Sequence, residues 1–167
     1  MIVVVMPVPV AAQALKGRAR VLDLRERARS ATRMAAALMG APAPEFRLDR
    51  QGRPCPHLGW HWSYSHNKRA VAGGVNRRPV GVDIESDRPP TMVGDTSAWV
   101  QAEATLKSMG LGIRRLSQVR FPFGTRGGAV QIGDARVQVS LFRRAPLWAA
   151  CTGVGVHWVV EEPEHAF

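Results

Sequence analysis

Val80-Gly81-Val82-Asp83-Ile84-Glu85 alternates apolar and acidic side chains over its last four residues. Successive side chains of a β-strand point to opposite faces, so we expect Val82 and Ile84 to face a core and Asp83 and Glu85 to share the other face. Two carboxylates on one face repel each other unless a cation lies between them, and such oxygen ligands suit Mg²⁺ or Mn²⁺. The commoner origin of this pattern is the solvent-exposed face of an amphipathic strand.

The segments on either side of this strand predict a mixed order of helices and strands, which favours the α+β class. Residues 1–167 are expected to form one compact unit, with a Pro- and Gly-containing connector at Arg88–Asp95 separating halves at 1–87 and 88–167. The expected strands are Met1–Met6, Trp60–Tyr64, Ala70–Val75, Val80–Ile84, Val119–Phe123, Ala129–Ile132, Arg136–Phe142 and Trp148–Val160, and the expected helices are Val21–Leu38 and Ser97–Met109.

Both expected helices carry an apolar stripe at spacings of three and four residues. The first stripe contains Val21, Leu24, Ala28, Ala31, Ala35 and Leu38, and the second contains Trp99, Ala102, Leu106 and Met109. Arg25, Arg29 and Arg33 follow one flank of the first helix, where they form either a phosphate-binding edge or a solvated charged face.

Glu103 and Lys107 lie one turn apart on the second helix. Such a pair is commonly a surface contact worth a few tenths of a kcal/mol. If the helix packs so that Glu103 reaches the strand of Asp83, three carboxylates could hold one metal ion, with Lys107 near a phosphate oxygen.

A hydroxyl and imidazole cluster, Ser63-Tyr64-Ser65-His66, ends an expected strand and is followed by Lys68. These groups can donate hydrogen bonds to a phosphate. A capped turn with a structural histidine is the alternative.

The chain is strongly cationic, with 23 Lys and Arg against 13 Asp and Glu and a formal net charge of +10. Three of the cations are lysines and the rest are arginines, which suits anionic partners. Cys55 and Cys151 lie in no metal-binding spacing, and no apolar run is long enough to span a membrane. The apolar start lacks the basic region of a secretion signal, so we expect a buried strand and a cytoplasmic protein.

Four segments together resemble the 4′-phosphopantetheinyl transferases, in the larger pseudo-dimeric form of that family. The resemblance runs from about Arg25 to Lys107. The matching segments are Gly52-Arg53-Pro54, Trp62-Ser63-Tyr64-Ser65-His66, the stretch from Val80 to Glu85 with Arg88, and the helix from Trp99 to Lys107.

This resemblance implies two similar halves, each with a helix packed on a small antiparallel sheet, in a monomer. It also implies transfer of 4′-phosphopantetheine from coenzyme A to a serine of an acidic acyl or peptidyl carrier protein, with release of 3′,5′-ADP. The carrier would serve fatty-acid, polyketide or peptide synthesis.

The residues take their roles from the same resemblance. Asp83, Glu85 and Glu103 would bind Mg²⁺ at the pyrophosphate of coenzyme A, Lys107 would lie near the transferring phosphate, and Glu103 would accept the proton of the attacking serine. Ser65 and His66 would contact the nucleotide phosphates, Arg53 would stand where the family has Lys, and Arg25 and Arg29 would face coenzyme A or the carrier.

The sequence departs from the family pattern at Ala102, where a Lys usually precedes the metal-binding Glu, and in the short interval of nineteen residues between Asp83 and Glu103. Two other functions therefore stay open. One is a non-catalytic descendant that binds carrier protein or coenzyme A. The other is a basic nucleic-acid-binding module, for which net charge is the sole motive.

Overall fold

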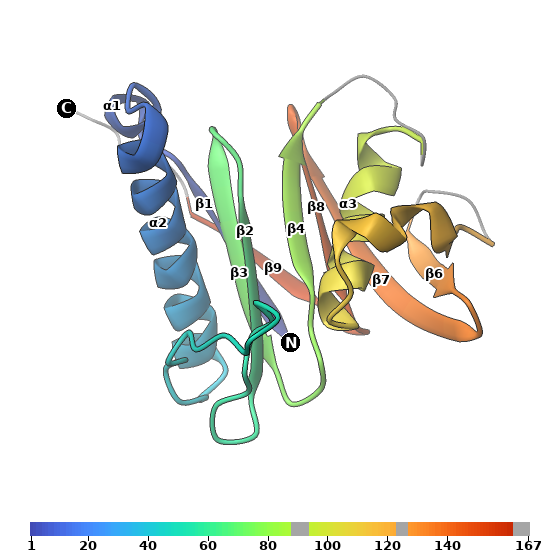
Figure 1. The fold of residues 1–167 in the computed structure, drawn as a ribbon. Helices are drawn as coiled ribbons and strands as arrows, with labels where there is room; N and C mark the ends of the chain where they lie inside the picture. The colour runs from blue at the N-terminus through green and yellow to red at the C-terminus, as the bar shows by residue number, and fades with distance from the viewer. Residues whose placement is uncertain (88–93, 123–126, 162–167) are drawn as a thin grey trace.

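The computed structural model describes residues 1–87, 94–122 and 127–161 (Figure 1). Its helices are α1 (Val10–Gln13), α2 (Gly17–Leu38) and α3 (Thr96–Ser108), with a short 3₁₀ helix, η1 (Ile113–Gln118). Its strands are β1 (Ile2–Pro7), β2 (His61–His66), β3 (Ala70–Asn76), β4 (Val82–Ser86), β5 (Val119–Arg120), β6 (Gly128–Ile132), β7 (Ala135–Arg144), β8 (Leu147–Thr152) and β9 (His157–Val160). The mixed α+β class is confirmed.

The strands form two sheets, one in the order β2-β3-β1-β9 and the other in the order β4-β8-β7-β6-β5. Every pair in the second sheet is antiparallel, whereas β9 runs parallel to β1 in the first. The first sheet therefore departs from the purely antiparallel arrangement expected for each half.

The two sheets pack face to face with a helix on each outer side, so the layers run α2, first sheet, second sheet, α3 (Figure 1). Alternation along β1 shows the layering, because Val4 packs with Leu24 and Ala28 of α2 while Val3 and Val5 pack with Val82 and Ile84 of β4. The site described below forms where β2, at one edge of the first sheet, meets β4, at one edge of the second.

Two expectations were wrong, one about the last strand and one about the buried stripe of α2. The single strand expected over Trp148–Val160 is two strands in different sheets, because the chain turns through Gly153 and Gly155, whose φ angles are +126° and +63°. Val21 and Leu38 were expected in the buried stripe of α2 but are 45% and 53% exposed. A helix of 22 residues is about 33 Å long and overhangs strands of about 20 Å.

The predicted halves exchange strands across residues 87 and 88. β4 belongs to the second sheet, although it lies within residues 1–87, and β9 belongs to the first, although it lies within residues 88–167. Most of the expected connector, residues 88–93, and the end of the strand expected at Val119–Phe123 lie outside the described residues. No helix among those that the structure describes is long and apolar enough to cross a membrane.

Candidate functional site

β4 places Asp83 at the junction of the two sheets. Val82 and Ile84 are in the core between the sheets, as predicted, and Asp83 points away from that core. The strand is fixed at its start because the Val82 amide donates to Ser63 Oγ at 2.9 Å and the Gly81 amide donates to Thr152 Oγ1 at 2.9 Å. Asp83 is 2% exposed, so it is not on the solvated face that the alternative required.

Gly81 lets α3 lie directly against β4. A Cβ atom at residue 81 would overlap the carbonyl oxygen of Ala104 and come within 2.7 Å of the amide nitrogen of Ser108. Only glycine permits this approach without displacing the helix. The close packing brings one turn of α3 over Asp83. The helix therefore packs on the strand of Asp83, as a shared site of Asp83, Glu103 and Lys107 requires.

Lys107 and Ser65 both bind the same oxygen of Asp83. Lys107 Nζ lies 2.6 Å from Asp83 Oδ1, and Ser65 Oγ donates to that oxygen at 2.8 Å. Lys107 Nζ also donates to the backbone carbonyl of Val82 at 3.1 Å and lies 3.8 Å from Glu103 Oε2. The ammonium group therefore stands between the two carboxylates.

Glu103 is the carboxyl group whose acidity the site changes most. Burial and the charge of Asp83 raise its pKa from the usual 4.5 to about 7, with a smaller contribution from Glu85, while Lys107 acts in the opposite direction. Near neutral pH Glu103 is therefore divided between its acid and base forms, which suits a group that accepts a proton.

His66 and Arg25 lie on the α2 side of the same cluster. Burial lowers the pKa of His66 below 6.5, and the positive charges of Lys107 and Arg25 lower it further. His66 is thus neutral at pH 7, and Arg25 is an exposed cation within its electrostatic reach. The structure brings both residues to the Asp83 cluster.

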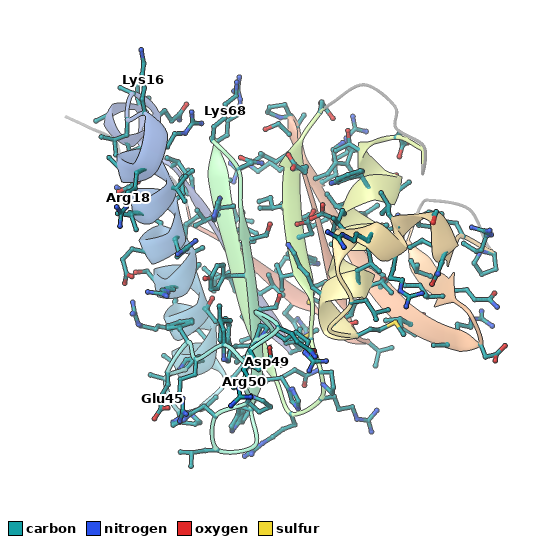
Figure 2. All side chains as sticks on the ribbon, in the orientation of Figure 1. Lys16, Arg18, Glu45, Asp49, Arg50 and Lys68 are labelled. Carbon is teal, nitrogen blue, oxygen red and sulfur yellow. The ribbon has the colours of Figure 1, made fainter. Side chains whose placement is uncertain are left out.

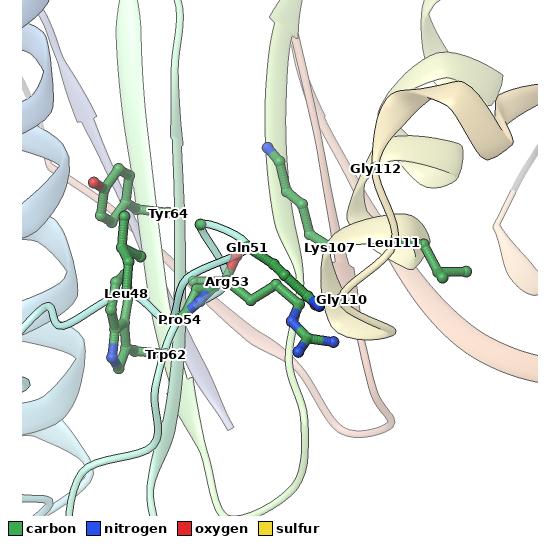
Figure 3. Close-up of a pocket in the computed structure, with 12 residues that line it drawn as sticks. Leu48, Gln51, Arg53, Pro54, Trp62, Tyr64, Lys107, Gly110, Leu111 and Gly112 are labelled. Carbon is green, nitrogen blue, oxygen red and sulfur yellow. The ribbon is translucent and has the colours of Figure 1, made fainter.

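A cleft of about 320 Å³ adjoins the cluster (Figure 3). Trp62 and Tyr64 stand on one side of it, Leu111 on the other, and Lys107 reaches it from α3. Arg53 lies along its floor, where its Nε pairs with Asp49 Oδ2 at 2.7 Å and its side chain runs beside Gly110 at the end of α3. The cleft thus joins a stacked aromatic pair to two cations.

Arg29 occupies a different position from the one expected of a phosphate ligand. Its guanidinium lies over the ring of Phe46, 5.4 Å from the centroid, and 3.6 Å from Glu26. Arg33 makes the same two kinds of contact, at 5.1 Å from Phe46 and 2.9 Å from Glu26. These two arginines therefore fix the segment around Phe46 to α2.

Lys16 and Lys68 lie at the end of α2 and the first sheet that is away from the cleft, and Arg18 lies on the outer side of α2 (Figure 2). Lys68 is at the exposed tip of the β2–β3 hairpin. Lys68 therefore lies just beyond the end of β2, with its side chain in solvent.

Ala102 is fully buried in the core between α3 and the second sheet, together with Val100, Ala104 and Leu106. A lysine at this position would point into apolar side chains. The lysine that precedes the metal-binding Glu in the family therefore has no equivalent place on this helix.

The acidic cluster has the chemistry of a magnesium site but holds its own cation. Asp83 Oδ2 is buried and has no hydrogen-bond partner among the described residues, and carboxylate oxygens are the ligands that Mg²⁺ prefers. As they stand, however, no three or more His, Cys, Asp or Glu side chains within residues 1–87, 94–122 and 127–161 are grouped to hold a metal ion. The carboxylates are ligands of the kind that Mg²⁺ prefers, but Lys107 Nζ is bound to one of their oxygens, Asp83 Oδ1.

Sequence reasoning missed Gly81, Ser63 as the anchor of β4, and the aromatic wall of the cleft. Gly81 could have been found from its place immediately before the Val82-Asp83 strand, since a glycine in a strand marks close approach of another backbone. Ser63 gave no such signal, because its partner is a backbone amide nineteen residues away.

The chain was compared with models of known protein families and with curated proteins, and neither comparison found a match.

Proposed function

We propose that the chain is a Mg²⁺-dependent 4′-phosphopantetheinyl transferase that moves the phosphopantetheine group of coenzyme A to a serine of an acidic acyl or peptidyl carrier protein. The observation that carries the proposal is the meeting of Asp83, Glu103 and Lys107 beside a cleft lined by Arg53. These residues come from three of the segments in which the sequence resembles that family. We further propose that the two sheet-and-helix layers are the two halves of the family's pseudo-dimer.

Lys107 and Arg53, which line the cleft, would face the pyrophosphate of coenzyme A. Asp83, Glu85 and Glu103 would hold Mg²⁺, whose bound charge offsets the negative charge on the pyrophosphate. Ser65 keeps Asp83 in its orientation through a 2.8 Å hydrogen bond. Neutral His66, with exposed Arg25 nearby, offers a hydrogen-bond donor and a positive charge to the nucleotide phosphates.

The proposed reaction is an attack by the carrier's serine hydroxyl oxygen on the phosphorus that bears the pantetheine. A new P–O bond forms to the serine, the P–O bond to the second phosphate breaks, and 3′,5′-ADP leaves. Glu103 accepts the serine proton, and Lys107 stabilises the charge of the phosphoryl group in transfer.

Transfer to an apo carrier protein, followed by intact-mass spectrometry, tests this proposal. We expect the variants Asp83→Asn and Glu103→Gln to transfer at least about 100-fold more slowly than the wild type, as is usual when a catalytic acid–base or charge-stabilising group is removed. The matched control is Asp134→Asn, which changes an exposed acid in the β6–β7 turn and should transfer at the wild-type rate.

Circular dichroism of the same variants separates loss of chemistry from loss of fold. Folded variants at both positions with wild-type transfer rates would contradict the proposal. A wild type that binds coenzyme A but modifies no carrier in the panel would favour the non-catalytic descendant instead.

A further inference from the structure

Lys107 is bound where an external cation would be expected. Its Nζ lies 2.6 Å from Asp83 Oδ1 and 3.8 Å from Glu103 Oε2, so one ammonium group reaches both carboxylates. Its third neighbour, the carbonyl oxygen of Val82 at 3.1 Å, is also a negative dipole end. Within residues 1–87, 94–122 and 127–161, the polar contacts described for this nitrogen are to oxygens, which are the ligands of a hard cation.

The two oxygens of Asp83 are not equivalent. Oδ1 receives both Lys107 and Ser65, whereas Oδ2 is buried without a hydrogen-bond partner among the residues described. A buried carboxylate oxygen without a partner is costly, so the pair with Lys107 leaves the charge of Asp83 only partly balanced. An ion that also bound Oδ2 would balance it more completely.

The charge of Lys107 opposes such an ion. A divalent cation bound to Asp83 would lie within a few ångströms of the ammonium at its observed position, in a region where solvent screens little. Because a lysine side chain is a flexible four-carbon chain, this repulsion can be relieved by moving Nζ away. Lys107 is 34% exposed and already lines the cleft, so it has space to move into.

We propose that Lys107 is the internal counter-ion of the acidic site and competes with a divalent cation for Asp83. In the metal-free protein it holds Asp83 and Glu103 together. When the cation binds, Lys107 leaves Asp83 Oδ1 and its ammonium turns into the cleft, where it is available to an anionic substrate. The inference rests on the proposed function, because that function supplies the need for a divalent cation.

The test measures metal binding alone, without coenzyme A or carrier protein. Free Mn²⁺ is counted by electron paramagnetic resonance during titration of the wild type and of Lys107→Met, which keeps the apolar chain and removes the charge. We expect Lys107→Met to bind Mn²⁺ at least about tenfold more tightly, and MgCl₂ to displace the Mn²⁺. Lys16→Met, which removes an exposed charge far from the cleft, should bind as the wild type does.

Equal or weaker binding by folded Lys107→Met would overturn the proposal, as would the absence of saturable binding in both proteins. A loss of metal affinity is the outcome expected if Lys107 supported the metal site instead of competing with it. The two accounts therefore predict opposite signs.

Acylation of the wild-type lysines with acetic anhydride keeps the test decisive if Lys107→Met does not fold. The extent of modification of Lys107, relative to Lys16, is measured by peptide mass spectrometry with and without MgCl₂. We expect the ratio to rise severalfold when Mg²⁺ is added, and an unchanged ratio would contradict displacement. Neither experiment measures transfer, so failure of the proposed reaction and failure of this competition are distinguishable.

Discussion

Asp83 is the residue through which the whole site is connected. It is almost fully buried, it accepts hydrogen bonds from β2 and α3 on a single oxygen, and its charge is one cause of the raised pKa of Glu103. A carboxylate placed in this way is costly to the fold unless its charge is balanced. Sites that perform acid–base chemistry commonly carry a group with a shifted pKa, as Glu103 has here.

Glu103 predicts how the stability of the metal-free protein depends on pH. Its pKa is about 7 in the folded state against 4.5 as the usual value, so the folded state holds the proton more strongly. The stabilisation is complete below pH 4.5 and is lost as the pH rises through 7. After allowance for solvent screening, we expect a loss of roughly 1–3 kcal/mol between pH 4.5 and pH 8.

Glu103→Gln isolates this contribution in urea unfolding at a series of pH values. His66 acts in the opposite sense, because its lowered pKa makes stability fall as the pH drops below 6.5, but it is present in both proteins. The difference in unfolding free energy between wild type and variant should therefore shift in favour of the variant as the pH rises. A difference that is constant from pH 5 to pH 8 would show that Glu103 is not perturbed.

The burial of Ala102 predicts that a lysine at this position is not tolerated. Replacing it by the lysine of the family would place a charged side chain in the core of α3 and the second sheet. We expect Ala102→Lys to lose about 3 kcal/mol of stability and to gain no transfer activity. Ala19→Lys, at an exposed position of α2, is the control for the residue type and should melt close to the wild type. A stable Ala102→Lys with faster transfer would contradict the packing described here.

At this scale the sequence predicted the orientation of Asp83 in its strand, but it did not predict the contacts of Arg29. Strand alternation is a local rule, and it correctly separated Asp83 from the core residues Val82 and Ile84. The position of Arg29 depends on Phe46, seventeen residues away in a loop, whose ring lies under two guanidinium groups. No periodicity within α2 contains that information.

Among the elements, the contact between α3 and β4 determines whether a site exists at all. Asp95 caps the start of α3, because its side chain accepts a hydrogen bond from the Ala98 amide at 3.0 Å, and Gly110, with a φ of +65°, follows the end of the helix. Between these ends the backbone of α3 packs directly against Gly81, the residue before β4, because glycine has no side chain in the way. In this packing Lys107 reaches Asp83.

Gly81→Ala is expected to separate the two elements. The added methyl group has no space between β4 and the backbone of α3, so the helix must shift, at a cost of at least about 2 kcal/mol. The shift should also lengthen the contact between Lys107 and Asp83 and lower transfer in proteins that remain folded. Urea unfolding measures the first effect.

Gly112→Ala is the matched control for stability, since a Cβ atom there meets nothing within 4 Å and its φ is −81°. We expect its unfolding free energy to lie within about 0.5 kcal/mol of the wild type. If Gly81→Ala were as stable as Gly112→Ala, the close approach of α3 to β4 would be refuted.

The elements themselves were predictable where their pattern is local. Helices α2 and α3 followed from stripes at helical spacing, and β2, β3 and β4 followed from apolar runs bounded by turns. The separation of β8 from β9 could not be predicted, because both strands are apolar and they differ only in the sheet to which they belong. β9 belongs to the first sheet because it pairs with β1, a long-range contact that a local sequence pattern does not contain.

On the scale of the whole molecule, the two sheets share the core that lies between them. The side chains of β1 and β3 pack against those of β4 and β8. After β8, in the second sheet, the chain returns to the first sheet as β9. The residues of the site therefore come from both sheets and from α3. A site built in this way depends on the relative position of the sheets, and the shared core fixes that position.

Charge also acts at this scale. The net charge of +10 favours the approach of anionic molecules. Coenzyme A and an acidic carrier protein both have the negative charge that a net positive protein attracts. This complementarity supports the proposed function as a whole, beyond the individual groups.

The most direct measurement is the intact mass of apo carrier proteins after incubation with the wild-type protein and coenzyme A, with MgCl₂ or with EDTA. The account predicts that a cognate carrier gains one phosphopantetheine group in MgCl₂, that one 3′,5′-ADP is released for each group transferred, and that EDTA prevents both. Unmodified masses across a panel of acyl and peptidyl carriers, from a folded protein in MgCl₂, would contradict the proposed transferase.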